Sequence, residues 1–226
     1  MNSASTLLQG EGVAKAYGEG TARVVAVDGV DITIGRGEFL AITGPSGSGK
    51  TTLLHCLAGL APLDRGRVLL EGTDITALSD DARTDLRARQ MGFVFQAHNL
   101  LPELTATENV ELPLVLRGAD AEAIRRSAAN RLAQVGLADR GGARPAQLSG
   151  GEQLRVAIAR ALVTDPTILW ADEPTGSLDT AAAADVVGLL RAAAQDGATV
   201  VVVTHSQEVA GSADRIVHLT DGRIAP

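Results

Sequence analysis

Residues 44–51 read GPSGSGKT and carry the pattern G-x-x-x-x-G-K-[ST]. Glycines at this spacing let backbone N–H groups turn inward around phosphate oxygens, Lys50 places a charge near the β and γ phosphates, and the Thr51 hydroxyl is a ligand for Mg²⁺. An apolar run at 39–43 precedes the loop and an apolar helical stretch follows it, which distinguishes a phosphate loop from a chance glycine-rich turn. The pattern predicts a nucleotide site built from Gly44, Pro45, Ser46, Gly47, Ser48, Gly49, Lys50, Thr51 and Thr52.

A pair of carboxylates, Asp172 and Glu173, follows the apolar run 168–171. Charged side chains avoid the end of a buried strand unless they are paired or hold a metal. A phosphate loop also needs an acidic partner on a neighbouring strand to hold its metal. We therefore expect Asp172 to be the Mg²⁺ residue and Glu173 to polarise a water for attack on the γ-phosphate. The alternative is that the two carboxylates simply begin a solvated loop.

A second glycine turn, LSGGEQLR at 148–155, begins another helix far along the chain. Ser149 and Glu152 have the spacing of a capping box, so the turn taken alone is explained equally well as a helix cap. A helix N-terminus with two glycines and a hydroxyl also suits a phosphate that approaches from outside. Because one nucleotide needs one cradle, the second explanation requires a nucleotide that is held elsewhere.

The composition limits the classes of function that are open. The chain has 226 residues, a formal net charge of -7 and 45% hydrophobic residues. Such an acidic chain does not suit the neutralisation of many DNA or RNA phosphates, so no nucleic-acid partner is expected. Cys56 is the only cysteine, which excludes an intramolecular disulfide and favours a reducing compartment. We find neither a signal-peptide pattern nor an apolar run of about 18 residues, and expect a chain that does not span a membrane.

The apolar patterns predict a mixed α/β fold. Between the strands near 92–95 and 168–171 the pattern becomes helical, with capping-box spacing at Thr105 and Glu108. We expect a single domain with a core lobe at about 1–96 and 164–226 and an inserted helical lobe at about 97–163. The remaining strands, of which the first two should belong to a small antiparallel sheet, are expected near 24–27, 30–34, 39–43, 68–70, 200–203 and 216–219.

Six motifs occur in the order found in the nucleotide-binding domains of ATP-binding cassette (ABC) transporters, which the chain resembles over essentially its whole length. They are Tyr17 in KAYG, the phosphate loop, Gln96 in VFQ, LSGGEQLR, LWADEPTGSLD and His205 in VVVTHS. The resemblance implies a P-loop NTPase core with a mostly parallel sheet, an N-terminal antiparallel β subdomain and an inserted helical subdomain. It also implies that ATP and Mg²⁺ are bound and that ATP is hydrolysed.

The resemblance further implies a role for each motif. The signature turn, Ser149, Gly150, Gly151 and Glu152, would close over the ATP of a second copy arranged head to tail, so the active form would be a homodimer with two composite sites. Tyr17 would stack on adenine. Gln96 would reach the metal and the attacking water and report occupancy to the helical lobe. His205 would contact the γ-phosphate and hold Glu173 and the water in line, and Asp179 would cross the dimer interface.

The segment VFQAHNLLPELTATENVELPLVLRG, followed by ADEPTGSLD, looks like the lipoprotein-releasing and macrolide-exporter ATPases of the LolD and MacB type. These imply an integral membrane permease, four-span and of the MacB/LolC-like type, and a peripheral position on the cytoplasmic face of the cell membrane. Two residues depart from the family pattern: Leu154 stands where a second glutamine is usual, and Ser177 where asparagine is usual. Neither departure removes a catalytic group.

Three classes of function remain open at this stage. The first is the ATP-hydrolysing subunit of a membrane complex for export, lipoprotein extraction or mechanotransmission. The second is a regulatory ATPase that controls a cell-envelope enzyme through a permease-like partner. The third, a DNA-maintenance or translation ATPase, is disfavoured by the acidic composition and the single cassette. For a permease, we expect the docking groove to include the segment after Gln96, with Leu100, Leu101, Pro102 and Leu104.

Overall fold

The computed structural model describes residues 5–176 and 178–225, which form two β-sheets. An antiparallel sheet has the strand order β2-β1-β4-β5, and a second sheet has the order β10-β9-β3-β8-β7-β6, in which only β10 is antiparallel to its neighbour. The strands of the antiparallel sheet are β1 (Thr6–Tyr17), β2 (Val24–Gly35), β4 (Arg65–Leu70) and β5 (Thr73–Asp74). Those of the second sheet are β3 (Phe39–Thr43), β6 (Met91–Val94), β7 (Ile168–Asp172), β8 (Thr199–Val203), β9 (Arg215–Thr220) and β10 (Arg223–Ile224).

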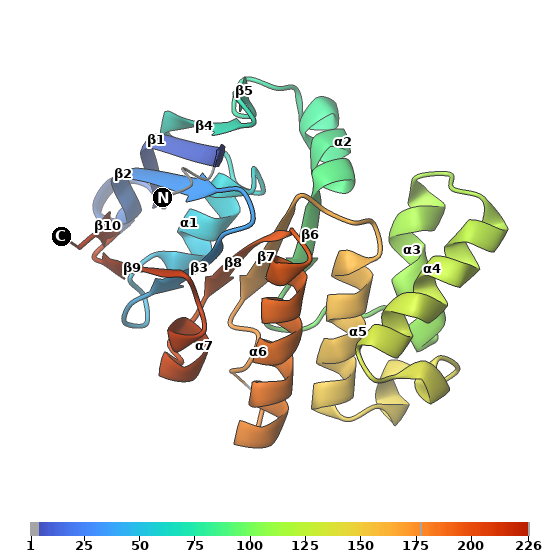
Figure 1. Ribbon diagram of the computed structural model, residues 1–226. Coiled ribbons are helices and arrows are strands. Elements are labelled where there is room, and N and C mark those ends of the chain that lie inside the picture. Colours follow the sequence, from blue (N-terminus) through green and yellow to red (C-terminus); the bar gives the residue numbers. More distant parts are fainter. Residues whose placement is uncertain (1–4, 177, 226) are drawn as a thin grey trace.

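Helices cover both faces of the mostly parallel sheet. α1 lies between the two sheets, α5 and α6 pack on the opposite face, and α3 and α4 lie beyond α5 at the far side of the molecule (Figure 1). The α-helices are α1 (Lys50–Leu57), α2 (Asp80–Gln90), α3 (Ala106–Leu116), α4 (Ala121–Gln134), α5 (Gly150–Leu162), α6 (Thr180–Gln195) and α7 (Gln207–Gly211). Short 3₁₀ turns are η1 (Gly20–Ala22), η2 (Ala138–Arg140) and η3 (Pro145–Gln147).

The strands of the parallel sheet are apolar at successive positions because both of their faces are buried. Along β7, Ile168 and Trp170 belong to the core around α1, whereas Leu169 and Ala171 belong to the core around α5 and α6. All four side chains are buried. A slip of this strand by one residue would exchange the two sets of side chains, so the packing fixes the register of the strand.

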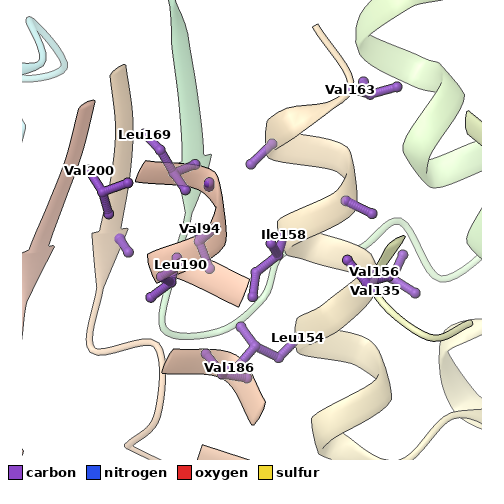
Figure 2. Close-up of a cluster of buried hydrophobic side chains, with 14 of the residues drawn as sticks. Val94, Val135, Leu154, Val156, Ile158, Val163, Leu169, Val186, Leu190 and Val200 are labelled. Atoms are coloured by element: carbon purple, nitrogen blue, oxygen red, sulfur yellow. The ribbon is translucent and has the colours of Figure 1, made fainter. Parts of the chain in front are cut away.

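Helix α5 is packed from two sides. Leu154 and Ile158 point toward Val186 and Leu190 of α6, and Val156 faces the other way toward Val135 at the end of α4 (Figure 2). Leu154, which departs from the family pattern, is fully buried. A glutamine there would bring a polar amide into an apolar contact, so leucine suits this packing.

The fold class predicted from the sequence is confirmed, with two differences in detail. The two strands expected near 24–27 and 30–34 are one continuous strand, β2, and its partner β1 was not expected; register shifts between β1 and β2 let the pairing continue through irregular positions. Helix α2 was not expected, because it buries none of its residues and so has no apolar stripe. It is formed instead by local polar signals, namely the Ser79 cap, two acidic residues in the first turn and arginines in the last.

Two glycine-to-alanine substitutions should affect stability in opposite directions. On β6, a Cβ at Gly92 would lie 2.3 Å from the Ala161 carbonyl oxygen, so Gly92→Ala should lower the free energy of unfolding by about 2 kcal/mol. On α6, Gly188 is exposed with nothing within 4 Å of an added Cβ, and Gly188→Ala should raise it by about 0.5–1 kcal/mol. Urea unfolding of both variants measures the difference, and a stable Gly92→Ala variant would contradict the close packing of α5 on β6.

Candidate functional site

Four neighbouring strands end at the same edge of the parallel sheet, and each leads into a residue singled out from the sequence. β3 leads into the phosphate loop, β6 into Gln96, β7 into Asp172 and Glu173, and β8 into His205. Ligands bind at the carboxyl ends of strands in such sheets. A pocket of about 650 Å³ lies there, lined by Ala26, Gly44, Pro45, Ser46, Gly47, Gly49, Lys50, Thr51, Thr52, Gln96, Glu173 and His205.

Backbone atoms of other segments pack closely against the phosphate loop. A Cβ at Gly44 would lie 2.1 Å from the Leu219 carbonyl oxygen, and one at Gly49 would lie 1.9 Å from the Ala26 carbonyl oxygen. Gly49 also has a φ of 98°, which favours glycine. The backbone N–H of Gly222 donates to the Ser48 carbonyl at 3.0 Å. These contacts hold the base of the loop while Gly44, Gly47 and Gly49 face the pocket.

The loop is chemically suited to a polyphosphate. Lys50 is buried, and its ammonium donates to the Gly44 and Pro45 carbonyls, both at 3.0 Å. These partners are neutral, and within the described residues Lys50 forms no salt bridge. The Ser48 hydroxyl oxygen is buried without a hydrogen-bond partner within the described chain. A buried cation and an orphaned hydroxyl at the N-terminus of α1 fit the oxygens of a phosphate group.

Thr51 lines the pocket and Asp172, which does not, contacts Thr51; together their oxygens suit a hard cation. The Thr51 hydroxyl donates to Asp172 Oδ1 at 3.0 Å. Burial raises the pKa of Asp172 above its ordinary value, against the opposing hydrogen bond from Thr51. Within the described residues no cluster of three or more His, Cys, Asp or Glu side chains could hold a metal. Mg²⁺ keeps most of its waters and needs only one or two protein oxygens, so this pair is compatible with it.

The side chains of Glu173 and His205 are in direct contact at the rim of the pocket. His205 Nδ1 lies 2.8 Å from Glu173 Oε2, and the His205 backbone N–H donates to the same oxygen at 3.4 Å. Glu173 has a φ of 45°, which is uncommon for a residue with a side chain. Its N–H donates to the Val203 carbonyl at 2.8 Å, which ties the strained residue to β8. Backbone strain that is held by its surroundings is typical of functional positions.

Tyr17 lies at the end of β1, outside the lining of this pocket but close to it along the sheet. It pairs with Val24 on β2, two residues before Ala26, which does line the pocket. The ring is about half exposed, and the ammonium of Lys15 lies 5.5 Å from its centroid. Asp64 holds Lys15 at 3.2 Å. The tyrosine is therefore positioned from one side and accessible from another.

The signature turn lies on a separate surface. Ser149 Oγ accepts the Glu152 N–H at 3.2 Å, and Glu152 Oε2 accepts the Ser149 N–H at 2.8 Å, so both bonds of the predicted capping box are present. The hydrogen bond from Ser149 N–H lowers the pKa of Glu152. None of Ser149, Gly150, Gly151 and Glu152 lines the pocket of the phosphate loop.

Asp179 lies next to the signature turn. An added Cβ at Gly151 would lie 3.5 Å from Ala182 Cβ on α6, and Asp179 caps the same helix by accepting the Ala182 N–H at 2.9 Å. The structure therefore brings the site residues together in two groups, one around the phosphate loop and one around the N-termini of α5 and α6. Ser177 lies outside the described residues.

Asn109 is a buried polar residue that the sequence reasoning missed. It accepts the Leu101 N–H at 2.8 Å and donates to the carbonyls of Leu101, Leu104 and Thr105 at 3.0–3.2 Å. It thus holds the loop that follows Gln96 against α3. The available signal was a lone asparagine one residue after the capping-box glutamate, on the helix face whose other buried residues, Ala106 and Val110, are apolar.

A family model described as ABC transporter matches residues 27–176. The chain belongs to the ABC transporter family. It is 49% identical over 93% of its length to an uncharacterized ABC transporter ATP-binding protein of Thermotoga maritima, and covers 90% of that protein. It is 46% identical over 99% of its length to the lipoprotein-releasing system ATP-binding protein LolD of Bordetella avium, of which it covers 98%.

The macrolide export ATP-binding/permease protein MacB of Brucella melitensis is 47% identical over 96% of the chain, which spans about a third (34%) of that relative. Among solved structures, a dimeric, post-hydrolysis state of the ATP-binding cassette MJ0796 bound to ADP and Pi matches with a TM-score of 0.91 and 42% identity, and 97% of both chains is covered. The chain is accordingly an ATP-binding subunit of the LolD- and MacB-like type, with ATP hydrolysis as its activity.

Over the part of the chain that the structure describes, no helix combines the length and apolar character needed to cross a bilayer.

Removal of the Lys50 ammonium should weaken ATP binding itself. Lys50→Ala deletes the positive charge in the pocket, so the Kd for ATP should rise by about tenfold or more in calorimetric titrations at fixed Mg²⁺. Arg126→Ala on α4 is the matched control and should leave Kd unchanged, because among the described residues Arg126 forms a salt bridge only with Glu122 on the same helix. An unaltered affinity in Lys50→Ala would show that this loop is not where the phosphates bind.

Proposed function

We propose that two copies of the chain meet head to tail, so that the signature turn of each copy closes the phosphate pocket of the other. The observation that carries this proposal is the separation of the two groups of site residues within one copy. A pocket open on one side and a helix N-terminus with Gly150 and Gly151 are complementary half-sites. The dimeric structures of MJ0796, 41–42% identical to this chain, support the arrangement.

Within each composite site, the residues around the pocket would divide the work of hydrolysis. Tyr17 stacks on the adenine, and the phosphate loop with Lys50 holds the phosphates. Thr51, Asp172 and Gln96 would hold a Mg²⁺ ion, which would supply positive charge to neutralise the phosphates. Ser149 of the other copy contacts the γ-phosphate, and Asp179 links the two sites across the interface.

The chemical step follows from the contact between Glu173 and His205. The Glu173 carboxylate accepts a proton from a water as the water oxygen attacks the γ-phosphorus in line, and the bond to the leaving ADP oxygen breaks. The imidazole, 2.8 Å from Glu173 Oε2, fixes the direction of the carboxylate and contacts the γ-phosphate. The strained backbone of Glu173 keeps the carboxylate at the end of β7 rather than in the solvent.

The chain would act on an integral membrane permease from the cytoplasmic face of the cell membrane. A groove of about 870 Å³ opens between α2 and β6 on one side and α3 and α5 on the other. Leu116 is 79% exposed and Leu60 is 40% exposed, and both line this groove. Exposed apolar side chains gathered in one groove are typical of a surface that takes an amphipathic helix.

The groove differs from the one expected from the sequence. Phe95 and Asn99 line it, whereas Leu100, Leu101, Pro102 and Leu104 are not among its lining residues. We propose that a cytoplasmic helix of a four-span permease binds here. ATP-driven closure would then move the helical lobe, 97–163, against the core lobe, 1–96 and 164–226, and drive export, lipoprotein extraction or mechanotransmission. Control of a cell-envelope enzyme through a permease-like partner is the second candidate and uses the same groove.

Glu173→Gln should separate ATP binding from turnover. The amide cannot accept the proton of the attacking water, so kcat should fall by about a hundredfold or more, while ATP binding persists. ATP and Mg²⁺ should then shift the variant to a dimer in size-exclusion chromatography. Adding Ser149→Arg, which obstructs the signature turn, should abolish that dimer. Hydrolysis by Glu173→Gln at the parent rate would overturn the assignment of the base.

Leu116→Glu should weaken attachment to the permease without affecting ATP hydrolysis by the isolated chain. The charge would have to be desolvated in the groove, so the fraction of chain bound to native membranes should fall about tenfold or more. Val115→Glu is the matched control, because Val115 is the adjacent residue, is 53% exposed and does not line the groove. Equal membrane binding by both variants would exclude the groove as the docking site.

A further inference from the structure

Arg160, near the C-terminal end of α5, is hydrogen-bonded to the loop that follows Gln96. Its guanidinium donates to the Asn99 carbonyl at 2.6 Å and to the His98 carbonyl at 2.8 Å. Burial lowers the pKa of Arg160, but an arginine remains charged at neutral pH. A mostly buried cation that binds two consecutive neutral carbonyls is a strong, directional contact.

The two residues that Arg160 holds have an unusual backbone. His98 has a φ of 58° and Asn99 a φ of 50°, both in the left-handed region. Such a conformation costs free energy in non-glycine residues and persists only where neighbours fix it. The His98 N–H donates to the Phe95 carbonyl at 2.9 Å, which closes a turn around Gln96. Arg160 therefore fixes the turn that carries Gln96.

The same helix begins at the signature turn. Ser149 and Arg160 are eleven residues apart on one α-helix, a span of about 16 Å at 1.5 Å per residue. Helix α5 is one unbroken α-helix that is buried along most of its length against α3, α4, α6 and β6, which makes it a stiff connection between its two ends. A displacement of the turn around Gln96 is thus carried to Ser149 without a flexible joint.

We infer that Arg160 is a positioning residue that couples the Gln96 turn of one ATP site to the signature turn serving the other. This inference deepens the proposed function and rests on it, because the two turns serve different nucleotides only in the head-to-tail dimer. Arg160, Phe95 and Asn99 also line the groove proposed for the permease, so an occupant of the groove contacts the same clamp.

The test compares arginines that make similar contacts in different places. Arg160→Met keeps the apolar stem and removes the donors, and Arg160→Lys restores the charge without the planar fork. Arg117→Met is the matched control, because Arg117 lines the same groove and also donates to two carbonyls, those of Ala88 and Thr164, which lie outside the Gln96 turn. Each variant is made alone and combined with Gln96→Ala, and steady-state ATPase and thermal unfolding are measured.

Arg160→Met should lower kcat by about tenfold with KM for ATP within about twofold of the parent, and Arg160→Lys should recover part of the loss. In the Gln96→Ala background, Arg160→Met should lower kcat little further, because both substitutions interrupt the same connection. Arg117→Met should leave kcat near the parent value. Independent, multiplicative losses from Arg160→Met and Gln96→Ala, or equal losses from Arg160→Met and Arg117→Met, would reduce Arg160 to a packing residue and overturn the inference.

ATP-dependent dimerisation in the Glu173→Gln background separates this inference from the proposed function. Arg160→Met should weaken that dimer while the Kd for ATP of the single copy stays unchanged. A Glu173→Gln chain that fails to dimerise would contradict the proposed function itself. A dimer that forms equally well with and without Arg160→Met would leave the proposed function standing and remove only the role of Arg160.

Discussion

Both faces of the sheet formed by β3, β8, β7 and β6 are buried, and this double-sided packing sets the positions of the atoms that do the chemistry. A shift of any of these strands by one residue would exchange the side chains on its two buried faces. The carboxyl ends of the strands are therefore held side by side, and with them the phosphate loop, Gln96, Asp172, Glu173 and His205. Because the sheet is rigid at this edge, the loops that follow it can tolerate a buried charge and an unfavourable backbone conformation.

Several groups in or next to the pocket are in an unfavourable state when no ligand is bound. Lys50 has neutral partners, Ser48 Oγ has none within the described residues, burial raises the pKa of Asp172, and Glu173 has a positive φ. Each of these features opposes the stability of the empty chain and is relieved or used when phosphate oxygens and a cation arrive. Binding of the nucleotide should therefore stabilise the fold, since the ligand supplies partners that the protein alone lacks.

The sequence predicted the parts of the site that depend on local spacing. The glycine pattern of the phosphate loop, the carboxylates after β7 and the capping box at Ser149 are short-range signals with a direct physical meaning. The contacts of Asn109 and Arg160 could not be predicted, because each joins segments whose proximity is created by the tertiary fold. Helix α2 was not predicted, for a different reason. It is stabilised by its caps and charges, whereas hydrophobic periodicity detects only helices that bury an apolar stripe.

The capping box at the signature turn has a further consequence. In a lone copy, the Glu152 carboxylate already sits at the N-terminus of α5 and is held there by Arg140 at 3.0 Å. The Glu152 carboxylate thus occupies the helix N-terminus to which a phosphate would bind. Small anions in solution would have to compete with it. In the proposed head-to-tail dimer, a phosphate presented by the other copy would come with protein contacts that a free anion lacks. As proposed, the turn would therefore respond to a second copy that has ATP bound and would not respond to free phosphate.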